Sequence, residues 1–128
     1  MQRPVTEKLP GNDIMTMTDL IIDSIQDIKG KHIVKMDLRE IDEAPADFFI
    51  VCEGDSSTQV SAIAGNINKR VKDELGIRAS LTEGKTGGRW VLVDYFNVVV
   101  HIFHPEARAY YEIEDLWRDA KMTEYQNL

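Results

Sequence analysis

Residues 89–103 form the most informative stretch of the chain, and they read RWVLVDYFNVVVHIF. Two runs rich in β-branched and aromatic residues, 89–95 and 98–103, flank the pair Phe96 and Asn97. This pattern predicts a β-hairpin with a two-residue turn. Because the length of a hairpin turn determines the register, each residue of the first strand has a predicted partner on the second.

The predicted register gives the hairpin two different faces. On an almost wholly apolar face, the cross-strand pairs are Tyr95 with Val98, Val93 with Val100, and Val91 with Ile102. On the other face, the pairs are Trp90 with Phe103, Leu92 with His101, and Asp94 with Val99. Two interpretations of this mixed face stay open. Either helices cover it, with Asp94 and His101 as a structural polar pair, or it anchors a protein partner.

The first half of the chain alternates between helical and extended patterns. Apolar residues at helical spacing predict an amphipathic helix over 18–29, closed by Gly30. Partial alternation over 32–39 predicts a strand. The apolar run over 48–52 predicts a second strand that is buried on both faces.

The most regular helical pattern covers residues 56–75, where Ser56 and Gln59 make a capping box and Gly76 follows the last turn. This helix lies between predicted strands, so it can connect two strands of one sheet. A strand over 78–82 then leads through a glycine-rich segment into the hairpin.

After the hairpin, Pro105 suits the first turn of a final helix. Its apolar stripe is predicted to consist of Ala109, Ile113, Leu116, Trp117 and Ala120. The fold class is therefore α/β, with elements in the order αββαβββα. We expect residues 1–14 to be a mobile tail, 15–122 to form a single domain, and 123–128 to be a C-terminal tail.

The composition is that of an ordinary globular domain. The chain has 128 residues, 43% of them hydrophobic, and its 15 Lys and Arg against 22 Asp and Glu give a formal net charge of −7. A single cysteine, Cys52, excludes a disulfide framework and a cysteine-rich zinc module. No stretch has the apolar character of a membrane span or a signal peptide, so we expect the cytosol. The acidic balance argues against nucleic acid as the main partner and favours a basic protein.

The polar residues do not form a recognisable catalytic or metal site. Asp94 and His101 have no serine or cysteine nucleophile beside them, and His101 and His104 point to opposite faces of a strand. Cys52 lies inside an apolar strand and is expected to be an inert core thiol. The basic residues of the middle helix, Lys69, Arg70 and Lys72, are interpreted as a solvated helix face. We therefore predict no catalytic residue, metal or cofactor.

One segment could receive a phosphate. Residues 54–57 join a strand to a helix N-terminus, although a turn glycine followed by a serine cap also explains them. A nucleotidyltransferase would in addition need paired carboxylates to hold magnesium. Asp94 has no such companion, because Leu92 and Phe96 occupy the flanking alternate positions.

Three blocks of sequence carry a family resemblance. They read ADFFIVCEGDS at 46–56 and WVLVDY at 90–95 with VVVHIF at 98–103, followed by Pro105, Glu106, Arg108, Tyr111, Ile113, Glu114, Leu116 and Trp117. Through these blocks, the chain from Thr18 to Ala120 resembles the ribosome silencing factor family RsfS, also called Iojap. It departs from that family at Phe96 and Asn97, where relatives commonly have a turn of the Gly-Asp type.

The resemblance implies a fold and a function. The fold would be nucleotidyltransferase-like, with a mixed β-sheet flanked by helices but without the catalytic carboxylates. The protein would bind the large ribosomal subunit through ribosomal protein L-fourteen, block its association with the small subunit, and repress translation when nutrients are limiting. Such a mechanism is steric and needs no enzymatic activity.

Carried over by position, the partner-binding candidates are Trp90, Leu92, Asp94, Tyr95, His101 and Phe103, followed by Arg108, Tyr111 and Glu114. A minor contact with ribosomal RNA and a homodimer of the free protein stay open. The rival hypothesis is a nucleotidyltransferase-like enzyme that binds a triphosphate at 54–56 and magnesium at Asp94.

Overall fold

The computed structural model describes residues 11–85 and 87–128. In chain order, the elements are α1 (Gly11–Asp27), β1 (Lys31–Asp37), β2 (Phe48–Glu53), α2 (Ser57–Leu75), β3 (Leu81–Lys85), β4 (Trp90–Asp94), β5 (Val98–Phe103), α3 (Pro105–Tyr111), α4 (Ile113–Leu116) and β6 (Lys121–Tyr125). Residues 1–10 of the predicted N-terminal tail lie outside the described residues.

A six-stranded sheet organises the fold, in the order β3-β4-β5-β2-β1-β6. β2 and β5 run parallel near its centre, and the other neighbouring strands pair antiparallel. α2 carries the chain from β2 to β3 at the edge of the sheet, as predicted for a connecting helix. The predicted α/β fold, a mixed sheet flanked by helices, is confirmed.

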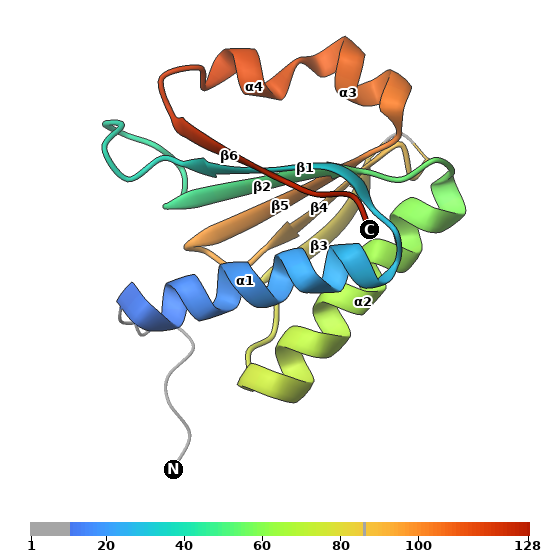
Figure 1. Ribbon diagram of the computed structural model, residues 1–128, viewed down its shortest axis with the longest axis horizontal. Helices are drawn as coiled ribbons and strands as arrows, with labels where there is room; N and C mark the ends of the chain where they lie inside the picture. Colours follow the sequence, from blue (N-terminus) through green and yellow to red (C-terminus); the bar gives the residue numbers. More distant parts are fainter. Residues whose placement is uncertain (1–10, 86) are drawn as a thin grey trace.

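Helices pack on both faces of the sheet. Figure 1 shows α1 and α2 beneath the strands and the pair α3 and α4 above them. Ile25 and Ile67 belong to the core on the α1–α2 side, whereas Phe49 and Ile113 belong to the core on the other side. β2 supplies residues to both cores because its side chains alternate, and five of its six residues are buried, as predicted.

The two ends of α2 follow the signals in its sequence. The Ser56 hydroxyl accepts a hydrogen bond from the Gln59 N–H at 3.1 Å, and Gln59 Oε1 accepts one from the Asp55 N–H at 2.6 Å. At the other end, Gly76 adopts a φ of 69° and donates its N–H to the Lys72 carbonyl. Glycine adopts this left-handed conformation without a steric penalty, so the helix ends where predicted.

The first helix begins earlier than predicted. α1 starts at Gly11, so residues 11–14 of the predicted tail are helical, and the predicted start at Thr18 is wrong. Ile14 and Met17 are buried and continue the apolar face of the helix towards its N-terminus. Burial of Ile14 and Met17 is the physical reason for the earlier start.

The C-terminal part differs most from the prediction. The expected single helix is broken at Glu112, which has a φ of 47° and separates α3 from α4. Leu116, predicted to lie on the apolar stripe, is 74% exposed. The chain then forms β6, which pairs with β1, so the predicted tail over 123–128 is wrong for residues 123–125.

The strand before the hairpin is also displaced. β3 spans Leu81–Lys85 rather than the predicted 78–82, so part of the glycine-rich segment lies in the strand. In the part of the chain that the structure describes, no helix combines the length and the apolar character needed to span a bilayer.

Candidate partner-binding surface

The β4–β5 hairpin has the predicted register. The pairs of its mixed face are Trp90 with Phe103, Leu92 with His101, and Asp94 with Val99. Beyond the last of these pairs, the Tyr95 N–H donates to the Val98 carbonyl at 2.8 Å. The two-residue turn and the division of the hairpin into two faces are therefore confirmed.

The apolar face of the hairpin packs against the α1–α2 side of the core. Tyr95 lies on this face and is buried, and its hydroxyl donates to Asn68 Oδ1 at 2.9 Å. Burial raises the pKa of the Tyr95 hydroxyl. Tyr95 therefore points into the core on the side of the sheet opposite Trp90.

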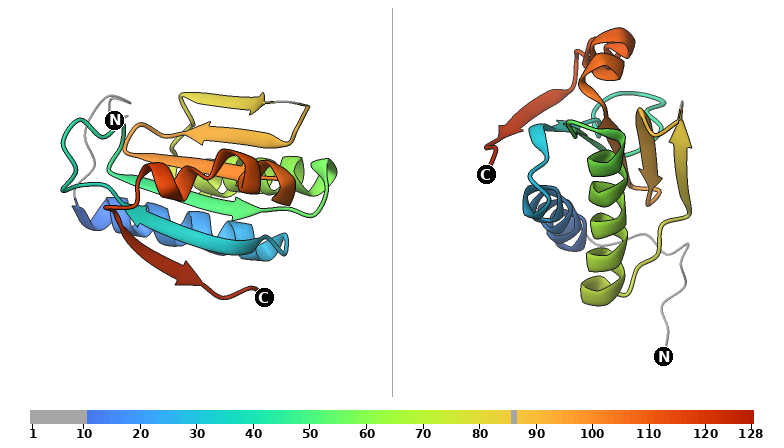
Figure 2. Two further views of the ribbon diagram at one scale, coloured as in Figure 1. Left: turned by 90° about the horizontal axis from the view of Figure 1, so that it is seen from above. Right: turned by 90° about the vertical axis from the view of Figure 1, so that its right-hand side faces the viewer.

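The mixed face of the hairpin is only partly covered. In the left view of Figure 2, α3 and α4 cross the middle strands and leave β3 and β4 open. His101 and Phe103 on β5 are buried, with 4% and 0% of their surface exposed. On β4, Trp90, Leu92 and Asp94 are half-buried. The interpretation as core thus holds for β5, whereas β4 presents an open surface.

Trp90 links the covered and the open parts of this face. Its indole Nε1–H donates to His101 Nδ1 at 3.1 Å, and its ring centroid lies 5.0 Å from that of Phe103. The ring of Tyr111 on α3 lies 4.6 Å from the Trp90 ring, and Tyr111 is 38% exposed. Aromatic pairs at such distances attract one another, so these side chains hold a defined arrangement at the edge of the helix pair.

β3 adds two side chains that were not predicted for this surface. Cross-strand partners share a face, and Leu81 pairs with Asp94 while Glu83 pairs with Leu92. Both β3 residues are exposed. We call the set Leu81, Glu83, Trp90, Leu92, Asp94 and Tyr111 the β3–β4 surface. Glu83 was missed because the strand was predicted to end at Thr82, whereas Leu81 lay in the predicted strand but had no predicted pairing partner.

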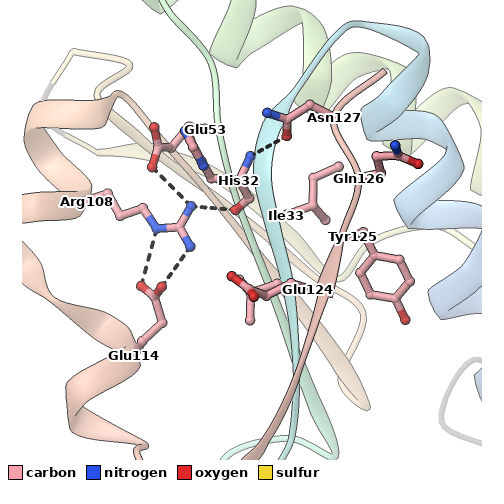
Figure 3. Close-up of a pocket in the computed structure, with 10 residues that line it drawn as sticks. His32, Ile33, Glu53, Arg108, Glu114, Glu124, Tyr125, Gln126 and Asn127 are labelled. Atoms are coloured by element: carbon pink, nitrogen blue, oxygen red, sulfur yellow. Dashed lines mark hydrogen bonds and ion pairs between the residues drawn. The ribbon is translucent and has the colours of Figure 1, made fainter.

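Arg108 and Glu114 face one another between α3 and α4. Arg108 Nη2 lies 2.7 Å from Glu114 Oε2, and its Nη1 lies 3.1 Å from Glu53 Oε2. The same Nη1 donates to the His32 carbonyl oxygen at 2.6 Å. Figure 3 shows the guanidinium between these three groups, and only 11% of the Arg108 side chain is exposed. This Arg108 network connects α3 with α4, β1 and β2.

A groove of about 600 Å³ opens beside the Arg108 network, and β6 contributes Glu124 and Tyr125 to its lining. It lies towards the β1–β6 edge of the sheet, away from the β3–β4 surface. Two of its carboxylates, Glu53 and Glu114, already pair with Arg108. Among the described residues, no three His, Cys, Asp or Glu side chains are grouped as metal ligands.

The groups that a nucleotidyltransferase would combine lie apart. Gly54 follows β2, and its N–H donates to the carbonyl of Phe103, whereas Asp94 pairs with Val99. Phe103 and Val99 are four residues apart on β5, which corresponds to roughly 13 Å along the strand. The structure therefore does not bring the predicted triphosphate and magnesium groups together.

Two further predictions concern side chains outside this surface. Cys52 is buried, and burial raises the pKa of its thiol to about 12, which agrees with an inert core cysteine. Lys69 and Arg70 form ion pairs with carboxylates of α1 and α2. Lys69 pairs with Asp73 within α2, whereas Arg70 also bridges α2 to Asp23 and Asp27 of α1.

The chain is similar in sequence to a known protein family. The family model described as "Ribosomal silencing factor during starvation" matches residues 12–128. "Ribosomal silencing factor RsfS" of Halalkalibacterium halodurans is 40% identical over 112 residues, which cover 88% of this chain and 94% of that protein. The Bacillus subtilis protein of the same name is 43% identical over 98 residues, covering 77% and 81%.

A solved structure shares the fold as well. The crystal structure of a Chromobacterium violaceum protein superposes with a TM-score of 0.76 at 39% sequence identity. The match covers 81% of this chain and 85% of that one. With the family model matched over 12–128 and these relatives alike over most of their length, the chain belongs to the RsfS/Iojap family.

Proposed function

We propose that the protein is a non-catalytic silencing factor that binds the large ribosomal subunit through ribosomal protein L-fourteen. Bound there, it blocks association with the small subunit and represses translation when nutrients are limiting. The observation that supports this proposal is that the chain belongs to a family whose members most like it in the comparison above are named ribosomal silencing factors. We place its action in the cytosol, where the ribosomes that it would silence translate.

The β3–β4 surface is the proposed contact with the ribosomal protein. Its aromatic side chains, Trp90 and Tyr111, are of the kind that anchor protein interfaces. Leu81 adds exposed apolar surface beside them. Glu83 and Asp94 add negative charge beside them, which suits a basic partner. The net charge of −7 would also steer the protein towards such a partner, so association should be faster at low salt.

The other predicted contact residues have a supporting role in this proposal. Tyr95, His101 and Phe103 are buried, so none of them can reach a partner unless the fold opens. Arg108 and Glu114 are engaged with one another. We therefore assign these five residues to holding the surface in place rather than to contacting the ribosome.

The proposed mechanism is steric. A folded domain attached to one subunit occupies volume that the other subunit needs, and no bond is made or broken. Inhibition then depends on how much of the large subunit is occupied, which follows from the affinity and the concentration of the protein.

The experiment compares two arginine variants of exposed leucines. Leu81→Arg places a cation on the β3–β4 surface, whereas Leu116→Arg makes the same change on α4, outside that surface. Leu81 and Leu116 are 48% and 74% exposed, so both variants are expected to fold. Purified large subunits are sedimented with each protein, and the bound fraction is measured over a range of concentrations.

We expect wild type and Leu116→Arg to sediment with the large subunit alike and Leu81→Arg to bind about tenfold more weakly, because the new cation would face a basic partner. If wild type stays at the top of the gradient, the proposed function is wrong. If wild type binds and Leu81→Arg binds equally well, the β3–β4 surface is not the contact.

A further inference from the structure

The turn between β4 and β5 holds an aromatic residue in an unusual backbone conformation. Phe96 has a φ of 71°, in the left-handed region. Within the two-residue loop of the hairpin, the Asn97 N–H donates to the Tyr95 carbonyl at 2.9 Å, which closes a γ-turn centred on Phe96. A three-residue turn with positive φ at its centre is rare and strained, and a bulky side chain there is an outlier.

The fold gains little from the Phe96 ring in return. Phe96 is 60% exposed, so most of the ring surface remains in water. The turn itself is held by the backbone, because the Asn97 carbonyl accepts hydrogen bonds from the N–H groups of Asp47 and Phe48 at 2.9 and 3.0 Å. The hairpin register does not need an aromatic ring at this position, since glycine adopts the same conformation without strain.

Phe96 lies where the β3–β4 surface ends at the turn. Its N–H donates to Asp94 Oδ1 at 2.7 Å, and Asp94 belongs to that surface. Leu81, which pairs with Asp94 across β3 and β4, is itself an exposed apolar side chain. The backbone of Phe96 is thus tied to a surface that combines apolar side chains and carboxylates, and its exposed ring lies at the end of that surface nearest the turn.

We propose that Phe96 is an aromatic anchor that extends the β3–β4 surface and inserts into an apolar pocket on the basic ribosomal partner. Strained residues persist where the surrounding structure holds them in place, and they gather at functional sites. Burial of an exposed ring in a partner is the gain that offsets the strain. This inference rests on the proposed function and names one contact of the same site.

Variants of Phe96 separate the ring from the strain. Phe96→Gly removes both, Phe96→Ala removes the ring and keeps a side chain at positive φ, and Phe96→Tyr keeps an aromatic ring. The control is Lys29→Gly, because Lys29 is also exposed with a φ of 62° but follows α1, away from the β3–β4 surface. Thermal unfolding and sedimentation with purified large subunits are measured for each protein.

The two measurements are expected to move in opposite directions. Phe96→Gly should raise the unfolding midpoint by about 3 °C and weaken large-subunit binding by about tenfold. Phe96→Ala should bind as weakly as Phe96→Gly, and Phe96→Tyr should bind like wild type. Lys29→Gly should likewise gain stability but keep wild-type binding.

Three outcomes would overturn the inference. Equal binding by wild type and Phe96→Gly shows that the ring is no anchor, while the proposed function stands. Loss of stability in Phe96→Gly, in parallel with loss of binding, assigns the ring to the fold. Failure of wild type itself to bind the large subunit overturns the proposed function and this inference together.

Discussion

Gly30 lies just after α1, at a position where the packing leaves no room for a side chain. The residue in the left-handed conformation after this helix is Lys29, with a φ of 62°, and not the predicted Gly30. A Cβ on Gly30 would clash with Ile25 Cγ2 and lie 3.3 Å from Ile63 Cδ1. The predicted glycine cap is therefore wrong, because α1 ends at Asp27 and Lys29 takes the left-handed conformation, whereas Gly30 is needed for close packing and not for its φ.

Replacing Gly30 by alanine should destabilise the protein, because the new methyl group must displace buried side chains. We expect the free energy of unfolding to fall by about 1–3 kcal/mol in urea titrations. Gly65→Ala is the matched control, since a Cβ at Gly65 in α2 meets no atom within 4 Å. That control should gain about 1 kcal/mol from helix propensity. Equal stability of Gly30→Ala and wild type would contradict the packing argument.

Asp37 gives a prediction about pH. The Arg39 guanidinium donates to both carboxylate oxygens of Asp37, at 2.9 and 2.7 Å, and this hydrogen bonding lowers the pKa of Asp37. A carboxyl whose pKa is lower in the folded than in the unfolded state contributes stability above its unfolded pKa, about 3.9. That contribution disappears as the pH falls through the folded pKa.

Asp37→Asn should therefore be less stable than wild type at pH 7, by less than about 1 kcal/mol, because Arg39 is half exposed and solvent screens the pair. The difference should shrink as the pH falls below about 4. Urea unfolding at pH 7 and at successively lower pH measures it. A difference that grows on acidification would contradict the assigned direction of the pKa.

At the scale of elements, the Arg108 network compensates for the shortness of α3 and α4. These helices have seven and four residues, and each buries one side chain, Ala107 and Ile113 respectively. Helices this short are unstable on their own. Arg108 binds Glu114, Glu53 and the His32 carbonyl, so it attaches the helix pair to the strands below.

Arg108→Ala should lower the free energy of unfolding by about 3 kcal/mol, because it leaves the Glu53 carboxylate, 15% exposed, without its cation. Arg108→Lys should restore part of this loss, since an ammonium cannot reproduce the planar contacts of a guanidinium. Arg118→Ala, at an exposed arginine just after α4, should stay within about 0.5 kcal/mol of wild type. A stable Arg108→Ala variant would show that the network does not hold the helix pair.

The elements that sequence analysis missed have weak local patterns. Four of the five residues of β6 are exposed, so this edge strand has no apolar alternation to reveal it. The break at Glu112 was missed because glutamate is a good helix former and no glycine or proline marks the position. By contrast, α2 was predicted at both ends because Ser56, Gln59 and Gly76 are explicit capping residues.

At the scale of the whole molecule, local and distant pairing differ in how well they could be predicted. The β4–β5 register was correct because both strands and their turn are contiguous in sequence. That register already placed Tyr95 on the apolar face with Val93. Tyr95 was included among the partner-binding candidates only because of the family resemblance. The pairing of β6 with β1 joins strands far apart in the chain and could not be predicted from a local pattern. β3 is a sequence neighbour of β4, but it was predicted three residues too early, so the pairing of Leu81 and Glu83 with β4 was found only in the structure.

The most direct test of the account is the joining of ribosomal subunits. Purified small and large subunits are mixed at a magnesium concentration that permits joining, with an excess of wild type, Leu81→Arg or Leu116→Arg, and separated on a gradient. We expect wild type and Leu116→Arg to travel with the large subunit and to reduce the joined peak, while Leu81→Arg leaves that peak intact. An undiminished joined peak in the presence of bound wild-type protein would contradict the claim that the protein keeps the subunits apart.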